Sequence, residues 1–412
     1  MSQEKKIVYF DQASSSSPKA EGLGAAITAY FEAGGYNISR GHYPGAEEAA
    51  VSVLNVRRML AQYFNFDSFR RVVFTNNITH SLNLVLKGFL RAGDEIITSS
   101  MEHNAVMRPL KQLSQQGVVV KIVQANEQGQ IDPQDFAKEL GPKTRAIVST
   151  AASNVSGTTQ DIFALGEIAK AAGIHFIVDS AQLAGHLAID SESLSCSAFC
   201  FTGHKGFRGP QGIGGVLLRE DLAGEIQALI SGGTGSFSDS EDMPPHLPDR
   251  LEAGTPNLPG ILGLGHAVSL KLKEKPFESF HKEATLLSSF LRGLEESIPA
   301  DSYRICGLGL EGAEATLAFA KQHLAESANF ATSLPPTMPL VSLDFKGRDN
   351  AELAYQLENR YGIMTRCGLH CAPRAHQSLN SFPQGTIRFS IGASNSEAEV
   401  AYVLSSLKEL LS

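Results

Sequence analysis

The chain has 412 residues, of which 42% are hydrophobic and 19% are charged, so it is long enough for two domains and too apolar for a disordered protein. A net charge of −8 without a basic stripe excludes a general nucleic-acid binder. No apolar run reaches the length of a membrane span, and five cysteines in so long a chain predict no disulfide framework.

The first residues of the chain predict a soluble, cytoplasmic protein. They are polar and lead into the short apolar run 7–10, which Asp11 follows. Such a run is too short for the hydrophobic part of a secretion signal. We therefore expect neither secretion nor membrane contact.

Short apolar runs alternate with amphipathic stretches between about residues 70 and 220. The runs predict strands at residues 72–74, 95–99, 118–123, 146–150, 176–179, 198–202 and 214–218. The amphipathic stretches predict helices at residues 79–90, 105–115 and 163–172, among others. This alternation is typical of an α/β fold, with a large, mostly parallel seven-stranded sheet and helices on both faces.

The second half of the chain predicts a long loop and then a smaller domain. Residues 232–259 are rich in Gly, Ser and Pro, which indicates a loop, and residues 261–273 predict a connecting helix. Helices then alternate with strands at residues 303–306, 340–345 and 386–391. We expect a large domain at residues 1–265 and a smaller α+β domain at residues 266–412, on which about residues 1–20 pack.

A lysine and an aspartate follow two of the predicted strands. Lys205 lies in the tight loop Gly203-His204-Lys205-Gly206, and Asp179 ends the preceding strand. In open α/β sheets the carboxyl ends of the strands form the ligand crevice. An amine and a carboxylate at this edge suit pyridoxal 5'-phosphate (PLP), because the lysine would form a Schiff base with the aldehyde and the carboxylate would pair with the pyridinium nitrogen.

Several hydroxyl and backbone groups near Lys205 are candidates for phosphate binding. Asn77-Ile78-Thr79 opens a predicted helix, where Thr79 or a neighbour would cap the helix and free N–H groups would face an anion. Thr202 and His204 flank the lysine. Ordinary helix capping is the alternative explanation.

Three further polar residues lie at predicted strand ends. His103 could stack on a planar cofactor and pass protons, although a structural histidine is the more frequent case. Gln182, three residues after Asp179, can reach the phenolic oxygen of the cofactor, and Asn154 is a similar candidate.

The stretch Arg366-Cys367-Gly368-Leu369-His370-Cys371-Ala372 is the second strong feature. Nearby Arg366 and Arg374 would favour a thiolate at Cys371, and the alternative is a buried structural thiol. The remaining cysteines, Cys196, Cys200 and Cys306, lie in or beside apolar strands and are expected to be buried thiols. A zinc site is disfavoured because the Cys-x3-Cys spacings are wider than is usual, so we expect no metal.

Arg388 lies on the predicted strand 386–391 and needs an anion if it is buried. A substrate carboxylate bound by two hydrogen bonds and a structural salt bridge are equally good candidates.

Together these motifs resemble the class V aminotransferase group of fold-type I PLP enzymes, and within it the cysteine desulfurase/selenocysteine lyase family. The resemblance covers nearly the whole chain and is strongest in Gly203-His204-Lys205-Gly206, Val178-Asp179-Ser180-Ala181-Gln182 and Glu252-Ala253-Gly254-Thr255-Pro256-Asn257. The short cysteine motif looks like that of the type II branch, although Leu369 replaces a histidine that many type II members have.

The resemblance implies a role for each matched residue. Lys205 holds the cofactor and removes the α-proton, and His103 stacks on the ring and serves proton transfer. Asp179 pairs with the ring nitrogen and Gln182 contacts the phenolic oxygen. The phosphate is held by Asn77, Ile78, Thr79, Thr202 and His204, with Thr255 contributed by a second subunit. Arg388 and Asn154 bind the substrate carboxylate, Arg40 and Arg366 line the entrance, and Cys371 attacks the substrate sulfur.

The implied function is an L-cysteine desulfurase, a cytoplasmic homodimer that passes persulfide sulfur from Cys371 to an acceptor protein, for example in iron–sulfur cluster assembly. A selenocysteine lyase would use the same site. A class V aminotransferase or epimerase that merely retains the cysteine is a further alternative, and a non-catalytic scaffold of the same fold is disfavoured by the presence of Lys205, Asp179 and Cys371 together.

Overall fold

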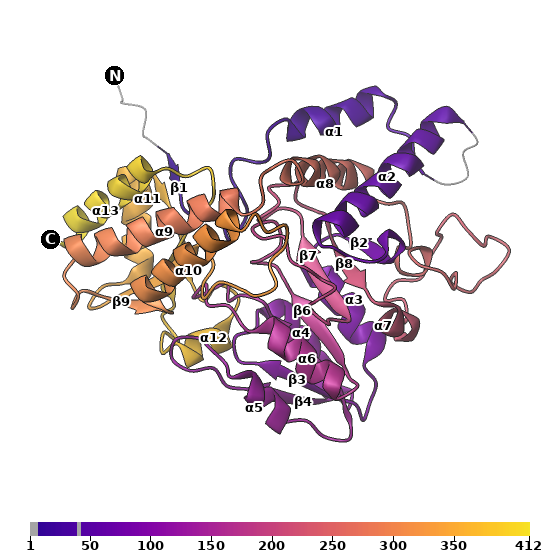
Figure 1. The fold of residues 1–412 in the computed structure, drawn as a ribbon, viewed down its shortest axis with the longest axis horizontal. Helices are drawn as coiled ribbons and strands as arrows, with labels where there is room; N and C mark the ends of the chain where they lie inside the picture. The colour runs from indigo at the N-terminus through magenta and orange to yellow at the C-terminus, as the bar shows by residue number, and fades with distance from the viewer. Residues whose placement is uncertain (1–6, 39–42) are drawn as a thin grey trace.

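The computed structural model describes residues 7–38 and 43–412. Its larger part is built on a seven-stranded sheet with the order β2-β8-β7-β6-β5-β3-β4 (Figure 1). The strands are β2 (Val72–Thr75), β3 (Glu95–Ser99), β4 (Val119–Val123), β5 (Thr144–Thr150), β6 (His175–Asp179), β7 (Ala198–Thr202) and β8 (Gly214–Leu218). Strands β3 to β7 pair in parallel, whereas β8 is antiparallel to both β7 and β2. The predicted α/β fold with a mostly parallel seven-stranded sheet is confirmed.

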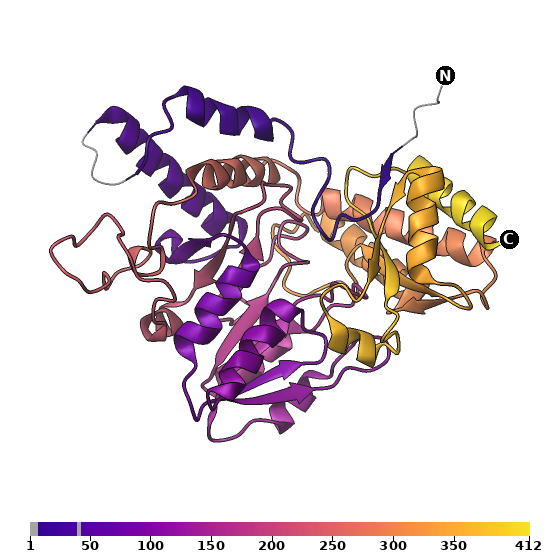
Figure 2. The same cartoon turned by 180° about the vertical axis from the view of Figure 1, so that it is seen from behind.

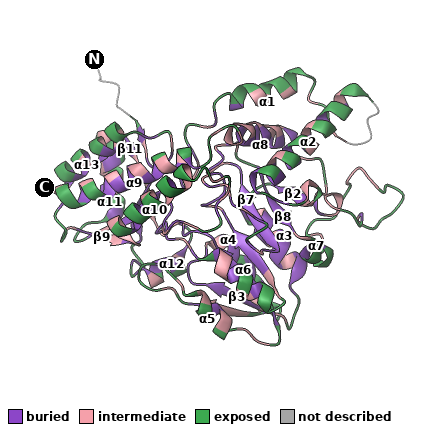
Figure 3. Cartoon of the chain, in the orientation of Figure 1, coloured by how far each residue is buried: buried purple, intermediate pink, exposed green. Residues whose placement is uncertain are grey.

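Helices cover both faces of this sheet. They are α1 (Leu23–Glu32), α2 (Pro44–Tyr63), α3 (Ile78–Phe89), α4 (Asn104–Gln115), α5 (Pro133–Lys138), α6 (Ile162–Ala171), α7 (Glu220–Glu225) and α8 (Leu258–Lys271). Alternate residues of a strand point to opposite faces, so Phe176 and Val178 pack with α2, α6 and α8 while Ile177 packs with α3 and α4. Apart from the edge strand β4, the strands are therefore mostly buried on both sides, and the outer faces of the helices are exposed (Figure 3).

The smaller part contains a four-stranded antiparallel sheet with the order β12-β13-β10-β9. The strands are β9 (Tyr303–Cys306), β10 (Leu340–Phe345), β12 (Arg366–Gly368) and β13 (Thr386–Ser390). The helices are α9 (Glu278–Ser297), α10 (Gly309–Ala325), α11 (Asn350–Tyr361), α12 (Pro373–Ser378) and α13 (Glu397–Leu411). The predicted boundary between residues 265 and 266 falls inside α8, and it stays a prediction.

The N-terminal segment lies against the smaller part. Strand β1 (Val8–Tyr9) pairs in parallel with β11 (Ile363–Met364), so the described start of the chain and its C-terminal helix lie on the same side of the molecule (Figure 2). Asp11 follows β1 and forms a bridge with Ser390. The residues after β1 therefore run along the junction of the two sheets.

A second connection joins the two parts through the segment between α10 and β10. Ala331 donates its N–H to the carbonyl of Ala188 at 2.8 Å, and its own carbonyl accepts from the N–H of Asp190 at 3.1 Å. The N–H of Thr159 bonds to the carbonyl of Pro336 at 3.1 Å. These backbone contacts give the segment a structural role at the junction.

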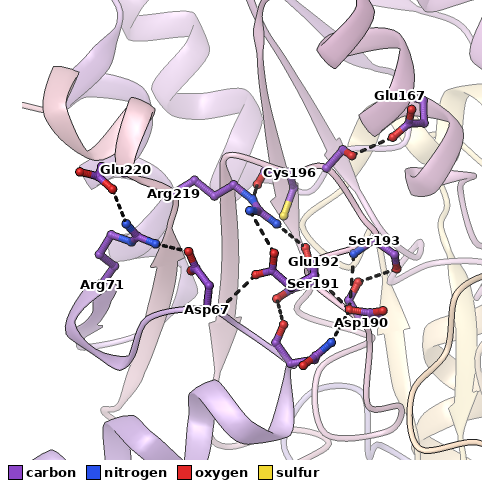
Figure 4. Close-up of polar contacts among 12 residues, drawn as sticks. Asp67, Arg71, Glu167, Asp190, Ser191, Glu192, Ser193, Cys196, Arg219 and Glu220 are labelled. Atoms are coloured by element: carbon purple, nitrogen blue, oxygen red, sulfur yellow. Dashed lines mark hydrogen bonds and ion pairs between the residues drawn. The ribbon is translucent and has the colours of Figure 1, made fainter.

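A polar cluster fixes the amino end of β7, at the edge opposite to Lys205 (Figure 4). Arg219, which follows β8, donates to the carbonyls of Cys196 at 3.0 Å and Ser191 at 2.9 Å and pairs with Glu192 at 3.4 Å. Because the guanidinium supplies donors in a planar fork, one side chain holds the loop that enters β7. Within the described ranges, no helix is both long and apolar enough to cross a membrane.

Candidate active site

A cavity of about 480 Å³ lies at the carboxyl ends of the parallel strands, between the two sheets. Its lining comes from eight separate stretches of the chain and includes ten residues that the sequence analysis placed in the site. They are Asn77, Ile78, Thr79, His103, Asn154, Gln182, His204, Lys205, Arg366 and Arg388. Ala13, Ser14 and His370 complete the lining.

Lys205 extends from a loop that packs closely against the residues after β6, which the glycine at position 206 allows. A Cβ atom at Gly206 would lie 2.5 Å from the carbonyl oxygen of Ala184. Within the described residues the Lys205 amine has neither a hydrogen bond nor an ion pair, and burial, followed by the charge of Arg388, lowers its pKa to about 8. A substantial neutral fraction near neutral pH makes this amine a good nucleophile.

Asp179 ends β6 and is only 2% exposed. The parallel register pairs it with Cys200 of β7, which brings the carboxylate to the same sheet edge as the Lys205 loop. Burial raises the pKa of Asp179, while the N–H of Ala181, at 2.9 Å from Oδ1, and the charge of Lys205 act in the opposite direction. A cation bound next to this carboxylate would keep it ionised.

The start of α3 and the Lys205 loop present donors that have no partner. The side chain of Asn77, and not that of Thr79, caps α3 by accepting from the N–H of His80 at 3.0 Å. The N–H groups of Ile78 and Thr79 have no carbonyl within the helix to bind, as at any helix start. Thr202 Oγ1 and His204 Nδ1 are buried and unpartnered among the described residues. These groups fit a phosphate.

His103 caps α4 through its ring. Its Nδ1 accepts from the N–H of Ala105 at 3.0 Å, and burial, then the charge of Lys205, lowers its pKa to about 4. The imidazole is therefore neutral at physiological pH, and because Nδ1 accepts, Nε2 carries the proton.

Glu102 is a buried acid that the sequence analysis missed. It is 0% exposed, and its Oε1 accepts from Ser99 Oγ at 2.5 Å and from the N–H of Thr150 at 3.0 Å. Burial raises the pKa of Glu102 to about 8, so the carboxyl is mostly protonated at neutral pH. Its position directly before His103 carries no sequence signal of burial, because acids at strand ends are usually solvated.

Arg388 lies on β13 and is 2% exposed. It donates from NH2 to Asp11 Oδ1 at 2.7 Å and from NH1 to the carbonyl of Asn154 at 2.9 Å, while its Nε is buried without a partner in the described chain. The salt-bridge alternative is thus present, with Asp11, which the sequence analysis had not paired with Arg388. The free Nε–H leaves the guanidinium able to bind a second anion.

Two other predicted residues contact the N-terminal segment. Gln182 donates from Nε2 to the carbonyl of Ala13 at 3.1 Å, and Arg366 donates from NH1 to Ser14 Oγ at 2.6 Å. Residues 13 and 14 thereby cover one side of the cavity.

The cysteine loop, residues 368–371, has an unusual backbone. His370 and Cys371 have φ angles of 47° and 59°, in the left-handed region that costs a non-glycine residue about 1–2 kcal/mol. Two bonds from the larger part hold the loop: the N–H of Asn104 bonds to the carbonyl of Cys371 at 2.8 Å, and Asn154 Nδ2 to that of His370 at 2.7 Å. The Cys371 residue is exposed, whereas His370 is buried.

The remaining cysteines are free thiols. Cys196, Cys200 and Cys306 are buried, as predicted, and burial raises the pKa of each. Cys367 is half-buried against the core of the smaller part, and burial raises its pKa as well.

One predicted residue of the cofactor site, Thr255, lies away from this cavity. Thr255 is exposed and lines a different cavity of about 580 Å³, between α2 and the loop 233–256. None of the predicted catalytic residues lines that larger cavity. Arg40 lies outside the described residues, so its predicted place at the entrance stays a prediction.

Known proteins are similar to this chain over almost its full length. The Aminotransferase class-V family matches residues 8–308 and 310–403. A protein from Pyrococcus abyssi named "Probable cysteine desulfurase" is 30% identical, over 99% of this chain and 95% of its own. One of the same name from Methanothermobacter thermautotrophicus is 29% identical, over 98% and 94%.

Solved structures have the same fold. The apo structure of a cysteine desulfurase from Thermococcus onnurineus superposes with a TM-score of 0.85 at 27% identity, covering 98% of this chain and 94% of the other. The cysteine desulfurase CsdA from Escherichia coli, in an S-sulfonic acid form, gives a TM-score of 0.80 at 25% identity, with coverage of 98% and 94%.

Proposed function

The chain belongs to the class V aminotransferase family, and from this premise we propose that it is a PLP-dependent L-cysteine desulfurase. The reaction converts L-cysteine and the Cys371 thiol to L-alanine and a Cys371 persulfide. The C–S bond of the substrate breaks, an S–S bond forms to Cys371, and a proton takes the place of sulfur on the carbon. The observation that carries the proposal is a buried, unpaired Lys205 amine in one cavity with the loop that bears an exposed cysteine.

The residues around the cavity fit PLP. Bound PLP supplies a conjugated ring that withdraws electrons from the α-carbon of an amino acid. We assign Lys205 to its aldehyde and Asp179 to its ring nitrogen, with His103 on the ring face and Gln182 at the phenolic oxygen. The unpartnered donors of Thr202, His204, Ile78 and Thr79, at the helix start capped by Asn77, are assigned to the phosphate.

The same residues account for substrate binding and proton movement. Arg388, with its free Nε–H, is assigned to the substrate carboxylate, assisted by Asn154, and Arg366 and Arg40 to the entrance. A pKa of about 8 lets the Lys205 Nζ take the α-proton and release it again near neutral pH. His103 is assigned to proton transfer as well, because its neutral ring carries a proton on Nε2 that it can donate.

The partners follow from the chemistry of the product. A persulfide on an exposed cysteine can be attacked by a thiol of an acceptor protein, so we propose such a protein as the second partner. Thr255 is assigned to the phosphate site of a second subunit, which makes the active form a homodimer. Cytoplasmic location is kept as a prediction of the sequence.

Selenocysteine lyase is the second candidate, because selenium would enter the same site with the same contacts. A class V aminotransferase or epimerase would keep Lys205 and Asp179 and would not need Cys371. Whether Cys371 takes up sulfur from cysteine therefore distinguishes a desulfurase from an aminotransferase or epimerase.

The deciding experiment is mass spectrometry of the holoenzyme after addition of L-cysteine, combined with measurement of alanine. We expect an added mass of one sulfur atom on Cys371 and equimolar alanine. Cys371→Ser should abolish the added sulfur and lower alanine formation at least about 100-fold, because the sulfur acceptor is lost. Cys367→Ser is the matched control and should keep both. Normal turnover of cysteine by Cys371→Ser would overturn the proposal.

A further inference from the structure

We propose that His370 is a positioning residue, which holds the cysteine loop in its left-handed conformation through a hydrogen bond to Thr386. The inference rests on the proposed function of Cys371 and adds a residue to which no role has been assigned. The proposed role of His370 concerns the position of the Cys371 thiol. The chemistry that we propose for the thiol stays the same.

The cysteine loop has little regular structure to support it. It links the end of β12 to the start of α12, and within it the N–H of Ala372 bonds to the carbonyl of Leu369 at 2.8 Å. Gly368, His370 and Cys371 all have positive φ angles, of 109°, 47° and 59°. Two successive non-glycine residues in this region persist only where surrounding contacts hold them.

Three contacts hold the loop, and they come from both parts of the molecule. Asn104 and Asn154, from the larger part, bind the carbonyls of Cys371 and His370. The third contact is made by a loop side chain: His370 Nε2 lies 3.1 Å from Thr386 Oγ1 on β13. Beyond Gly368, which pairs with Thr386 in the sheet itself, this contact ties the loop to the sheet that also carries Arg388.

The surroundings of His370 fit an anchor. The residue is 5% exposed and Thr386 is 0% exposed, so water does not compete for their bond. Thr386 pairs with Gly368 across β12 and β13, which places the hydroxyl directly beside the start of the loop. A Cβ atom at Gly385 would lie 2.4 Å from the Gly368 carbonyl carbon, which shows how closely the two strands approach here.

His370 is neutral, which also fits a role in holding the loop. Burial, then the charges of Arg388 and the neighbouring His376, lower its pKa to about 2. A neutral ring can share one hydrogen bond with a hydroxyl without placing a charge beside Arg388. The rings of His370 and His376 pack with centroids 5.4 Å apart, and His370 is one of the residues that line the cavity.

The test compares Thr386→Val with Thr386→Ser in the PLP-loaded enzyme. Valine keeps the shape and removes the hydroxyl, whereas serine keeps the hydroxyl. We expect Thr386→Val to slow single-turnover formation of the Cys371 persulfide about tenfold, which is the loss of one buried hydrogen bond. Thr386→Ser should stay within about twofold of the wild type. The absorption change when cysteine binds the cofactor should be the same in all three proteins.

His376→Asn is the control for general damage to this region. His376 is buried and bonds to Ser381 Oγ at 2.7 Å, yet it does not line the cavity. We expect this variant to lower the melting temperature without slowing persulfide formation. If Thr386→Val fails to fold, His370→Gln takes its place. Glutamine lacks the rigid ring that holds the hydrogen bond to Thr386, so we expect the same slowing of persulfide formation.

Equal rates in Thr386→Val and the wild type would overturn the inference, as would equal slowing by the valine and serine variants. Failure of the proposed function looks different: the wild type itself would then form no persulfide on Cys371.

Discussion

The two halves of the site are held in different ways. Asp179 ends β6 and Lys205 follows the adjacent parallel strand β7, and the ladder and two buried faces of these strands fix their positions. The cysteine loop is held by a few hydrogen bonds from both parts and carries two left-handed residues. Regular structure therefore supports Lys205 and Asp179, whereas a small number of tertiary contacts supports the exposed thiol of Cys371.

Burial explains the contrast in charge. Around Lys205, burial lowers the pKa of the amine and of His103 and raises that of Asp179. Cys371 is exposed at the surface of the same site. The acceptor protein proposed above would therefore reach this loop without entering the cavity.

Lys205→Ala should have the largest effect, because it removes the sheet-edge half of the site. We expect alanine formation to fall at least about 10³-fold and the purified protein to lack the absorption of a lysine-bound cofactor. Lys19→Ala is the matched control: burial lowers its pKa to about 8 too, but its amine bonds to Ser15, Ser16 and the His204 carbonyl, outside the cavity. Borohydride-trapped cofactor on Lys19 would contradict the assignment.

Arg388→Lys tests the contribution of the smaller sheet. A lysine lacks the planar fork that binds Asp11, the Asn154 carbonyl and a further anion together. We expect the KM for cysteine to rise about 30- to 100-fold with a smaller change in kcat. Arg374→Lys, an exposed arginine beside the cysteine loop, should leave KM within about twofold. An unchanged KM in Arg388→Lys would contradict a role of this arginine in substrate binding and would leave the salt bridge to Asp11 as its role.

Glu102→Gln should have the smallest effect on activity, within about threefold, because glutamine resembles the protonated acid. Its effect lies in stability. The folded pKa of about 8 is above the ordinary 4.5, so as pH rises between these values the unfolded state loses a proton that the folded state keeps, and the free energy of unfolding falls. The variant lacks this loss and should match the wild type near pH 4.5 and exceed it near pH 9, by at most about 5 kcal/mol.

Urea unfolding of both proteins at pH 5, 7 and 9 measures this difference. A gap that stays constant with pH would mean that Glu102 is ionised in the folded protein. A gap that widens with pH would extend the control of charge by burial from Asp179 to a second acid on the sheet edge.

Most elements of the larger part could be predicted because most of its strands are short, largely buried apolar runs. The predicted strands 95–99, 198–202 and 214–218 agree with β3, β7 and β8 in both bounds. Helices α1 and α2 were missed because they precede the alternating pattern, and the short strands β11 and β12 have too few residues to show a period.

The sequence by itself determined the fold class, the seven strands of the larger sheet in chain order and the residue types at their ends, because periodicity and glycine loops are local properties. Only the tertiary structure decided that Asp11 pairs with Arg388, that Glu102 is buried beneath the site and that Asn104, Asn154 and Thr386 hold the cysteine loop. Those contacts join residues up to 377 positions apart. Burial and pairing at such separations depend on how the two sheets pack, which no local pattern encodes.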